Sequence, residues 1–119
     1  MKRDMDLVRK LIFALEDSNH GFAPHVEVEG YTEERIGYHY YIMLQAGLIK
    51  GSDMTSMGCP SPQAMPTSLT WAGHEFADAA RSDTIWEKAK KTIKEKVGSA
   101  SVGLVTEYLA KLGKEALGM

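Results

Sequence analysis

The chain has 119 residues, with 14 Lys and Arg against 16 Asp and Glu, and its formal net charge is −2. This length allows one domain with a core that folds without a metal or a disulfide. A composition of 44% hydrophobic and 25% charged residues excludes wholesale disorder. The near-neutral charge balance lacks the basic excess that is usual in DNA-binding domains, because such domains gain affinity by neutralising phosphates.

Cysteine usage and hydropathy indicate a cytoplasmic protein. Cys59 is the single cysteine, so an intramolecular disulfide is impossible and a reducing compartment is the simplest expectation. No apolar run approaches the ~20 residues that cross a bilayer, and the first residues do not resemble a secretory signal. We therefore expect no membrane association, and no motif calls for a cofactor.

A first helix is expected over residues 5–16, with Asp4 as its N-cap. Its apolar residues recur at helical spacing, at Val8, Leu11, Ile12 and Leu15. Gly21 suits the left-handed position that ends such a segment. Residues 25–29 alternate polar and apolar side chains, which predicts a short strand.

A second helix is expected from Thr32, its N-cap, to residue 46. Its predicted buried stripe consists of Ile36, Tyr40, Met43 and Leu44. Gly47 ends the helix, and residues 48–50 and 68–71 are expected as two strands joined by a loop over 51–67. Three further helices are predicted: one over 72–81, one that starts at 82–84 and carries its apolar pattern over 85–97, and one over 105–116.

This order predicts an α+β, mainly helical fold that is a winged helix-turn-helix-like core. Three helices and a two- or three-stranded wing sheet would form a domain over residues 1–81, since compact domains seldom carry unstructured loops as long as 51–67. Residues 82–119 would form a C-terminal helical extension that packs on this domain or dimerises.

Several short motifs resemble one bacterial and phage family, which is called domain of unknown function twenty-five-thirteen. They are M-K-R-D-M-D-L-V-R at the start, Y-H at 38–39, A-G-L-I at 46–49, L-T-W-A-G-H-E-F at 69–76 and D-T-I-W at 83–86. The resemblance covers nearly the whole chain. It implies a winged-helix-like core with a helical extension, often encoded on prophages and other mobile elements, and it implies no established activity.

If the fold is a winged helix, the helix before the wing would enter the major groove of DNA. The candidate DNA-contacting residues outside the predicted buried stripe are Arg35, Tyr38, His39, Gln45 and Lys50. Against this, Glu33 and Glu34 occupy the first turn of that helix, and the loop over 51–67 holds no Lys or Arg. A solvated helix face is the plainer interpretation.

Two other segments favour a protein partner. Met54, Met57 and Met65 are flexible, polarisable side chains of the kind found on adaptable binding surfaces, although they could equally fold back on the core. The last predicted helix presents an apolar face with Tyr108, Leu109 and Leu112. Terminal helices of this kind commonly pair winged-helix proteins, so a homodimer is expected.

Catalysis has little support in the sequence. The four histidines show no metal-ligand spacing such as H-E-x-x-H, and no glycine-rich loop resembles a phosphate cradle. The leading hypothesis is therefore a non-enzymatic accessory or regulatory protein of phage or mobile-element type that binds double-stranded DNA through residues 32–46. The alternative is a module for protein–protein interaction or oligomerisation that does not bind DNA, with a host or phage protein as its partner.

Overall fold

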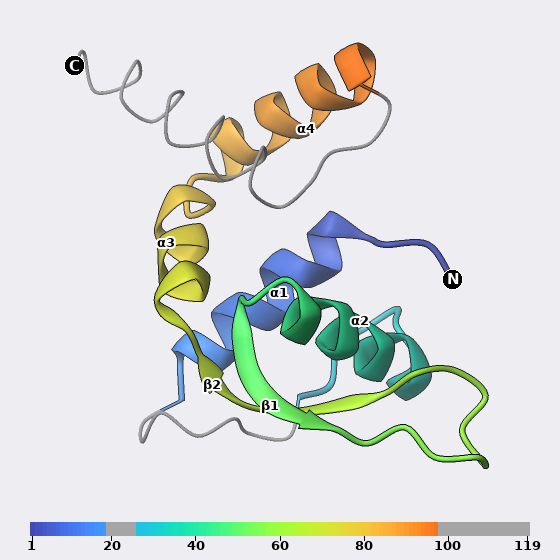
Figure 1. Cartoon of the computed structure of the whole chain (residues 1–119). Coiled ribbons are helices and arrows are strands. Elements are labelled where there is room, and N and C mark those ends of the chain that lie inside the picture. Colours follow the sequence, from blue (N-terminus) through green and yellow to red (C-terminus); the bar gives the residue numbers. More distant parts are fainter. Residues whose placement is uncertain (19–25, 98–119) are drawn as a thin grey trace. The chain divides into compact units, whose positions relative to one another are not determined.

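The computed structural model describes residues 1–18 and 26–97 (Figure 1). Its elements are, in chain order, α1 (Met5–Glu16), α2 (Glu33–Gln45), β1 (Ile49–Asp53), β2 (Ala64–Leu69), α3 (Trp71–Ala79) and α4 (Asp83–Val97). The fold class is α+β, as expected. The predicted helix over 105–116, with Tyr108, Leu109 and Leu112, lies outside the described residues.

Two compact units divide the chain, Met1–His74 and Glu75–Met119. The expected domain boundary after residue 81 stays a prediction.

Helix α1 begins at a strong N-cap. One carboxylate oxygen of Asp4, Oδ1, accepts hydrogen bonds from the backbone N–H groups of Asp6 (2.9 Å) and Leu7 (3.2 Å), which have no partner inside the helix. The buried side chains of α1 are Leu7, Val8, Leu11, Ile12 and Leu15. The predicted bounds, cap and apolar stripe of this helix are confirmed.

Helix α2 is capped by Thr32, whose hydroxyl oxygen accepts from the N–H of Arg35 at 3.1 Å. It ends before Gly47, which has a φ of 78° that L-residues with side chains rarely adopt. The stripe prediction was partly wrong, because Leu44 is only half-buried and His39 is buried, with no exposed surface. The expectation that His39 lies outside the core was wrong, and its hydrogen bonds supply the reason.

Strands β1 and β2 form an antiparallel hairpin whose register runs from Ile49 opposite Leu69 to Asp53 opposite Ala64. The strands extend further toward the loop than predicted, so the connection spans 54–63 instead of 51–67. Gly51 misled the prediction, because it lies inside β1 at a register shift where a side chain would meet the Met65 carbonyl. Residues 26–29 are not a strand, contrary to expectation.

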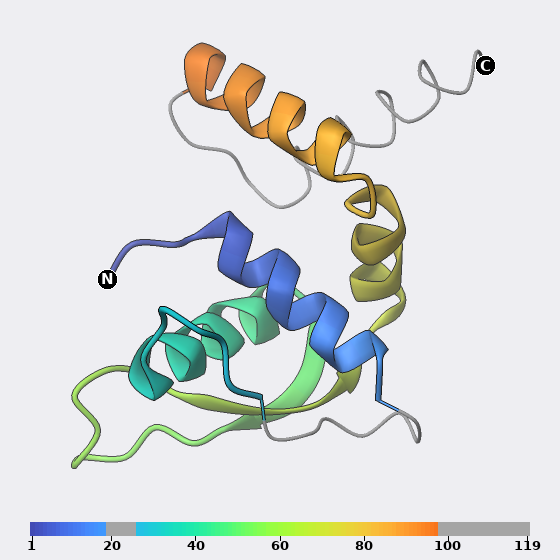
Figure 2. The same ribbon diagram turned by 180° about the vertical axis from the view of Figure 1, so that it is seen from behind.

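Both α1 and α2 lie on one face of this hairpin (Figures 1 and 2). Helix α2 packs on both strands, and α1 packs on α2 and β2. The side chains that fill this core come from all four elements and include Leu11, Met43, Ile49 and Ala64. One face of the hairpin is therefore covered by α1 and α2.

The second unit has aromatic packing of its own. The rings of Phe76 and Trp86, both buried, meet edge to face with centroids 5.9 Å apart. Ser82 starts α4 by accepting from the N–H of Ile85 at 3.3 Å. Helix α4 begins at Asp83 and ends at Val97, which confirms the helix start predicted at residues 82–84.

Candidate functional site

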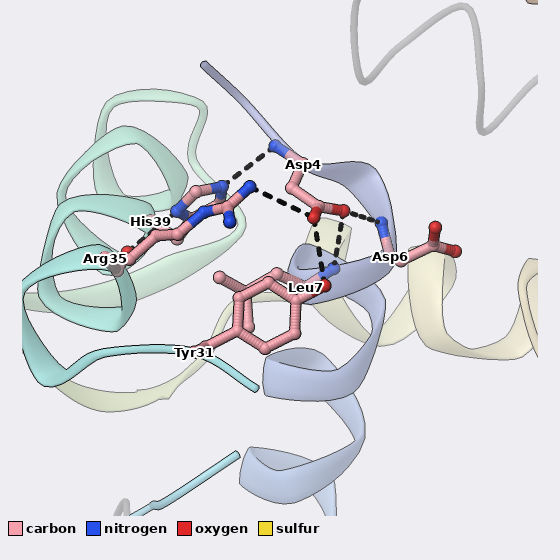
Figure 3. Close-up of polar contacts among 6 residues, drawn as sticks. All are labelled: Asp4, Asp6, Leu7, Tyr31, Arg35 and His39. Carbon is pink, nitrogen blue, oxygen red and sulfur yellow. Dashed lines mark hydrogen bonds and ion pairs between the residues drawn. The ribbon is translucent and has the colours of Figure 1, made fainter. Parts of the chain in front are cut away.

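His39 joins the start of α1 to the middle of α2 (Figure 3). The backbone N–H of Asp4 donates to Nε2 of His39 at 2.9 Å, and Nδ1 of the same ring lies 2.8 Å from the Arg35 carbonyl oxygen. Because Nε2 accepts, the proton of the neutral ring belongs on Nδ1 and is donated to that carbonyl. Burial lowers the pKa of His39, and the Arg35 charge lowers it further. His39 is thus a neutral structural link between α1 and α2, and its buried ring is not placed to contact a DNA base.

Arg35 is engaged at the same junction. Its guanidinium donates to Oδ2 of Asp4 at 3.3 Å and lies over the Tyr31 ring, 5.0 Å from its centroid. The Tyr31 hydroxyl donates to the same carboxylate oxygen at 2.9 Å (Figure 3). Burial, followed by the hydrogen bond to Asp4, raises the pKa of Tyr31. The single Arg of α2 is therefore already paired with an acid in this structure.

The remaining candidate DNA-contacting residues are accessible. Tyr38 stacks on Tyr41, with ring centroids 6.4 Å apart and planes 26° apart, and the side-chain amide of Gln45 donates to the Tyr41 hydroxyl at 3.3 Å. Lys50 is exposed on β1. The outward face of α2 is consequently aromatic and polar, and it carries no row of Lys or Arg side chains.

Gln63, near the end of the hairpin loop, fastens that loop to α2. Its side-chain nitrogen Nε2 lies 3.0 Å from the Glu34 carbonyl oxygen and 3.0 Å from the Ser61 hydroxyl. Gly37 leaves the space that this amide fills, because a Cβ at position 37 would overlap the Gln63 carboxamide. The loop of the hairpin is therefore held against the first half of α2.

A groove of about 530 Å³ opens between α2 and the hairpin. On the helix side, Glu33, Ile36, Gly37 and Tyr40 share one face at helical spacing. On the hairpin side the lining includes Met54, Ala64, Met65 and Pro66. Among the described residues, no Lys or Arg lines this groove, and most of the residues in its wall are apolar.

Tyr40 lines the groove and has a buried hydroxyl without a hydrogen-bond partner among the described residues. Its side chain is 6% exposed. Burial raises the pKa of Tyr40 to about 12, so the group is a neutral donor at neutral pH. A buried donor without a partner costs free energy.

An acidic hollow of about 480 Å³ adjoins the groove. Glu27, Glu29 and Glu33 line it, and Glu33 and Ile36 belong to both concavities. The apolar groove therefore continues into a carboxylate-rich one.

Two of the three methionines predicted to contact a partner lie at this groove. Met54 is 52% exposed and Met65 is 60% exposed, and both line it. Met57 is fully exposed at the loop and is not part of the lining. Sequence analysis missed Gly37 and Gln63, although a glycine in the middle of a helix was an available signal.

The part of the chain that the structure describes holds no group of three or more His, Cys, Asp or Glu arranged to bind a metal. Within the same residues, no helix has the length and apolar character needed to span a membrane.

Fold and groove define a small α+β protein in which a helix pair packs on a hairpin and leaves a partly apolar groove beside it. The chain belongs to the family described as Hypothetical protein (DUF2513), whose model matches residues 2–99. This confirms the family resemblance noted in the sequence. An uncharacterized protein of Haemophilus influenzae (strain ATCC 51907 / DSM 11121 / KW20 / Rd) is 36% identical over 98 residues, covering 81% of each chain. No solved structure matches.

Proposed function

We propose that this protein is a non-catalytic module that binds another protein through the groove between α2 and the hairpin. The observation that most supports this proposal is that the groove is open, lined mostly by apolar side chains and flanked by the exposed Met54 and Met65. Its volume of about 530 Å³ is in the range of known ligand sites, roughly 300–1,000 Å³. A bulky apolar side chain from a partner would fit it.

The groove combines a fixed wall with adaptable rims. Gln63 holds the loop on α2, and Pro66 restricts the backbone of β2, so little order has to be gained on binding. The two methionine side chains can adjust to the shape of a partner. We place this activity in a cytoplasmic accessory or regulatory protein of phage or mobile-element type, in keeping with the family resemblance and the lone Cys59.

Affinity capture with two matched variants tests the proposal. Met65→Glu puts a charge on the groove wall, whereas Met57→Glu puts the same charge on the loop away from the lining. Immobilised wild-type protein and both variants are exposed to an extract of the source cells, and retained proteins are quantified by mass spectrometry. We expect a protein that wild type and Met57→Glu retain equally and Met65→Glu loses; retention by all three alike contradicts the proposal.

DNA binding by a winged helix is the second candidate. The order of α2, hairpin and α3 and the accessible Tyr38, Gln45 and Lys50 favour it. The pairing of Arg35 with Asp4 and the burial of His39 weigh against it. A salt titration with random-sequence duplex DNA distinguishes the two candidates. Wild-type binding that weakens steeply with salt, and that the double variant Arg35→Ala/Lys50→Ala lacks, supports DNA as the target. Absence of binding even at low salt removes this candidate.

A further inference from the structure

We infer that the partner segment in this groove binds as an extended strand that adds to the outer edge of β2. This inference rests on the proposed function and adds the conformation of the bound segment and the groups that recognise it. It follows from the position of the groove along β2 and from the backbone groups of Ala64.

The groove runs along the edge of β2. Successive residues of a strand point to opposite faces of its sheet, yet Ala64, Met65 and Pro66 all line the groove. No residue of β1 (Ile49–Asp53) does so. The groove therefore lies beside β2 on the side away from β1, and not under one face of the hairpin. In the described part of the chain the sheet has two strands, so no third strand there pairs with this edge.

Ala64 directs its backbone polar groups toward this edge. The N–H of Met54 donates to the Gln63 carbonyl oxygen at 2.9 Å, so these two residues form a hydrogen-bonded pair of the ladder. Hydrogen-bonded and non-hydrogen-bonded pairs alternate in an antiparallel ladder. The next pair, Asp53 opposite Ala64, is therefore not hydrogen-bonded, and the N–H and C=O of Ala64 point away from β1. Neither group has a hydrogen-bond partner among residues 1–18 and 26–97.

Backbone groups that are covered to this extent normally have partners. Ala64 is only 8% exposed, and the great majority of buried backbone N–H and C=O groups in proteins are paired. Pro66, two residues further along the same edge, lacks an N–H, and sheets tolerate proline only where no ladder hydrogen bond is lost. The edge thus offers an added strand the N–H and C=O of Ala64 and the C=O of Pro66.

An extended peptide fits this edge better than a second copy of the chain does. In strand addition the backbone of the peptide supplies the hydrogen bonds, and its alternate side chains enter pockets. Side chains on the α2 side would meet Ile36 and Tyr40 across the groove, so we expect apolar residues at every second position. Two copies joined along β2 would each bring Pro66 to the shared edge, and both strands would then lack a donor.

The experiment obtains a probe by selecting displayed random 12-residue peptides on the full chain, and then scans the enriched peptide with single N-methyl residues. Each N-methyl group removes one backbone N–H of the peptide. Alternate N–H groups of an added strand point at β2. We therefore expect affinity to fall roughly tenfold at every second position of the bound segment and to change little at the positions between them.

Pro66→Ala tests the same edge from the side of the protein. It restores an N–H that points at the added strand, so affinity should increase roughly two- to tenfold, as expected for one further hydrogen bond. Thr67→Ala is the matched control, because it changes an exposed residue of β2 outside the lining of the groove, and it should leave the affinity unchanged.

The outcomes separate the inference from the proposed function. Peptides that lose affinity in Met65→Glu but tolerate N-methylation at every position, or lose affinity only at consecutive positions, refute the added strand and leave the protein-binding groove standing. A dimer of the free chain that Pro66→Ala strengthens, measured by light scattering, assigns the edge to a second copy and overturns the inference. Peptides that ignore both Met65→Glu and Pro66→Ala, or failure to enrich any sequence, refute the inference and the proposed function together.

Discussion

Gln63 of the hairpin loop occupies the space that Gly37 of α2 leaves open, and its amide nitrogen reaches the Glu34 carbonyl oxygen at 3.0 Å. The same residue closes the loop on itself, because its carbonyl oxygen accepts from the N–H of Met54 at 2.9 Å and its own N–H donates to Thr55 at 2.9 Å. A glycine in a helix costs stability that an alanine would not. The stability lost at Gly37 is offset by the Gln63 contact that this glycine permits, which fixes the hairpin wall of the groove.

A double-mutant cycle at these two positions tests this relationship. In a Gln63→Ala background, Gly37→Ala should stabilise the protein by roughly 0.5–1 kcal/mol, the usual difference in helix propensity. With Gln63 present, the new methyl group displaces the amide, so the same substitution should be neutral or destabilising. Urea unfolding of the four proteins measures both effects; equal effects in the two backgrounds would show that the residues do not interact.

The His39 link predicts a pH dependence of stability. Its pKa is lowered in the folded protein, so the unfolded chain binds the proton more readily. The free energy of unfolding should therefore be at its plateau above the ordinary histidine pKa of about 6.5 and should fall as pH decreases through it toward the lower folded value. Unfolding measured between about pH 7.5 and 5.5 should show a shallower slope in His39→Gln than in wild type.

An unchanged slope in His39→Gln would mean that another group causes the acid sensitivity. The described His74 offers a control, because it is exposed. His74→Gln should keep the wild-type slope.

Asp4 combines two functions that substitution can separate. Its Oδ1 caps α1, while Oδ2 accepts from Tyr31 and Arg35. Asp4→Asn keeps a good capping residue but removes the charge, whereas Asp4→Ala removes both. We expect Asp4→Ala to lower the free energy of unfolding by about 1 kcal/mol more than Asp4→Asn, the typical value of an N-cap. Equal losses would show that the cap contributes little.

The unpartnered Tyr40 hydroxyl predicts an effect on stability. Tyr40→Phe removes a buried donor that has no partner in the described residues, so the free protein should be as stable as wild type or up to roughly 1 kcal/mol more stable. Thermal unfolding measures this effect, and a large loss of stability would indicate that the hydroxyl already has a partner.

Local signals predicted much of the fold. The caps Asp4 and Thr32, the helical apolar spacing and Gly47 each act within a few residues, and the structure confirms them. Strand β1 was predicted too short because Gly51, a turn signal in isolation, lies at a register shift inside β1. That register shift depends on the partner strand and is invisible in the local sequence.

The site was predicted only in part. Met54 and Met65 were identified by their chemistry, and the structure places both at the groove. His39 was misplaced because its burial depends on the backbone N–H of Asp4, 35 residues away. The groove itself could not be foreseen, since it arises where Gln63 meets Gly37 across a long sequence separation.

The most direct test of the protein-binding groove is an NMR titration of the isotope-labelled full chain with the partner protein retained in the capture experiment. The account predicts that the largest amide shift changes cluster at Ile36, Tyr40, Ala64 and Met65 and vanish in Met65→Glu. Changes confined to the outward face of α2, at Tyr38, Tyr41 and Gln45, would contradict it.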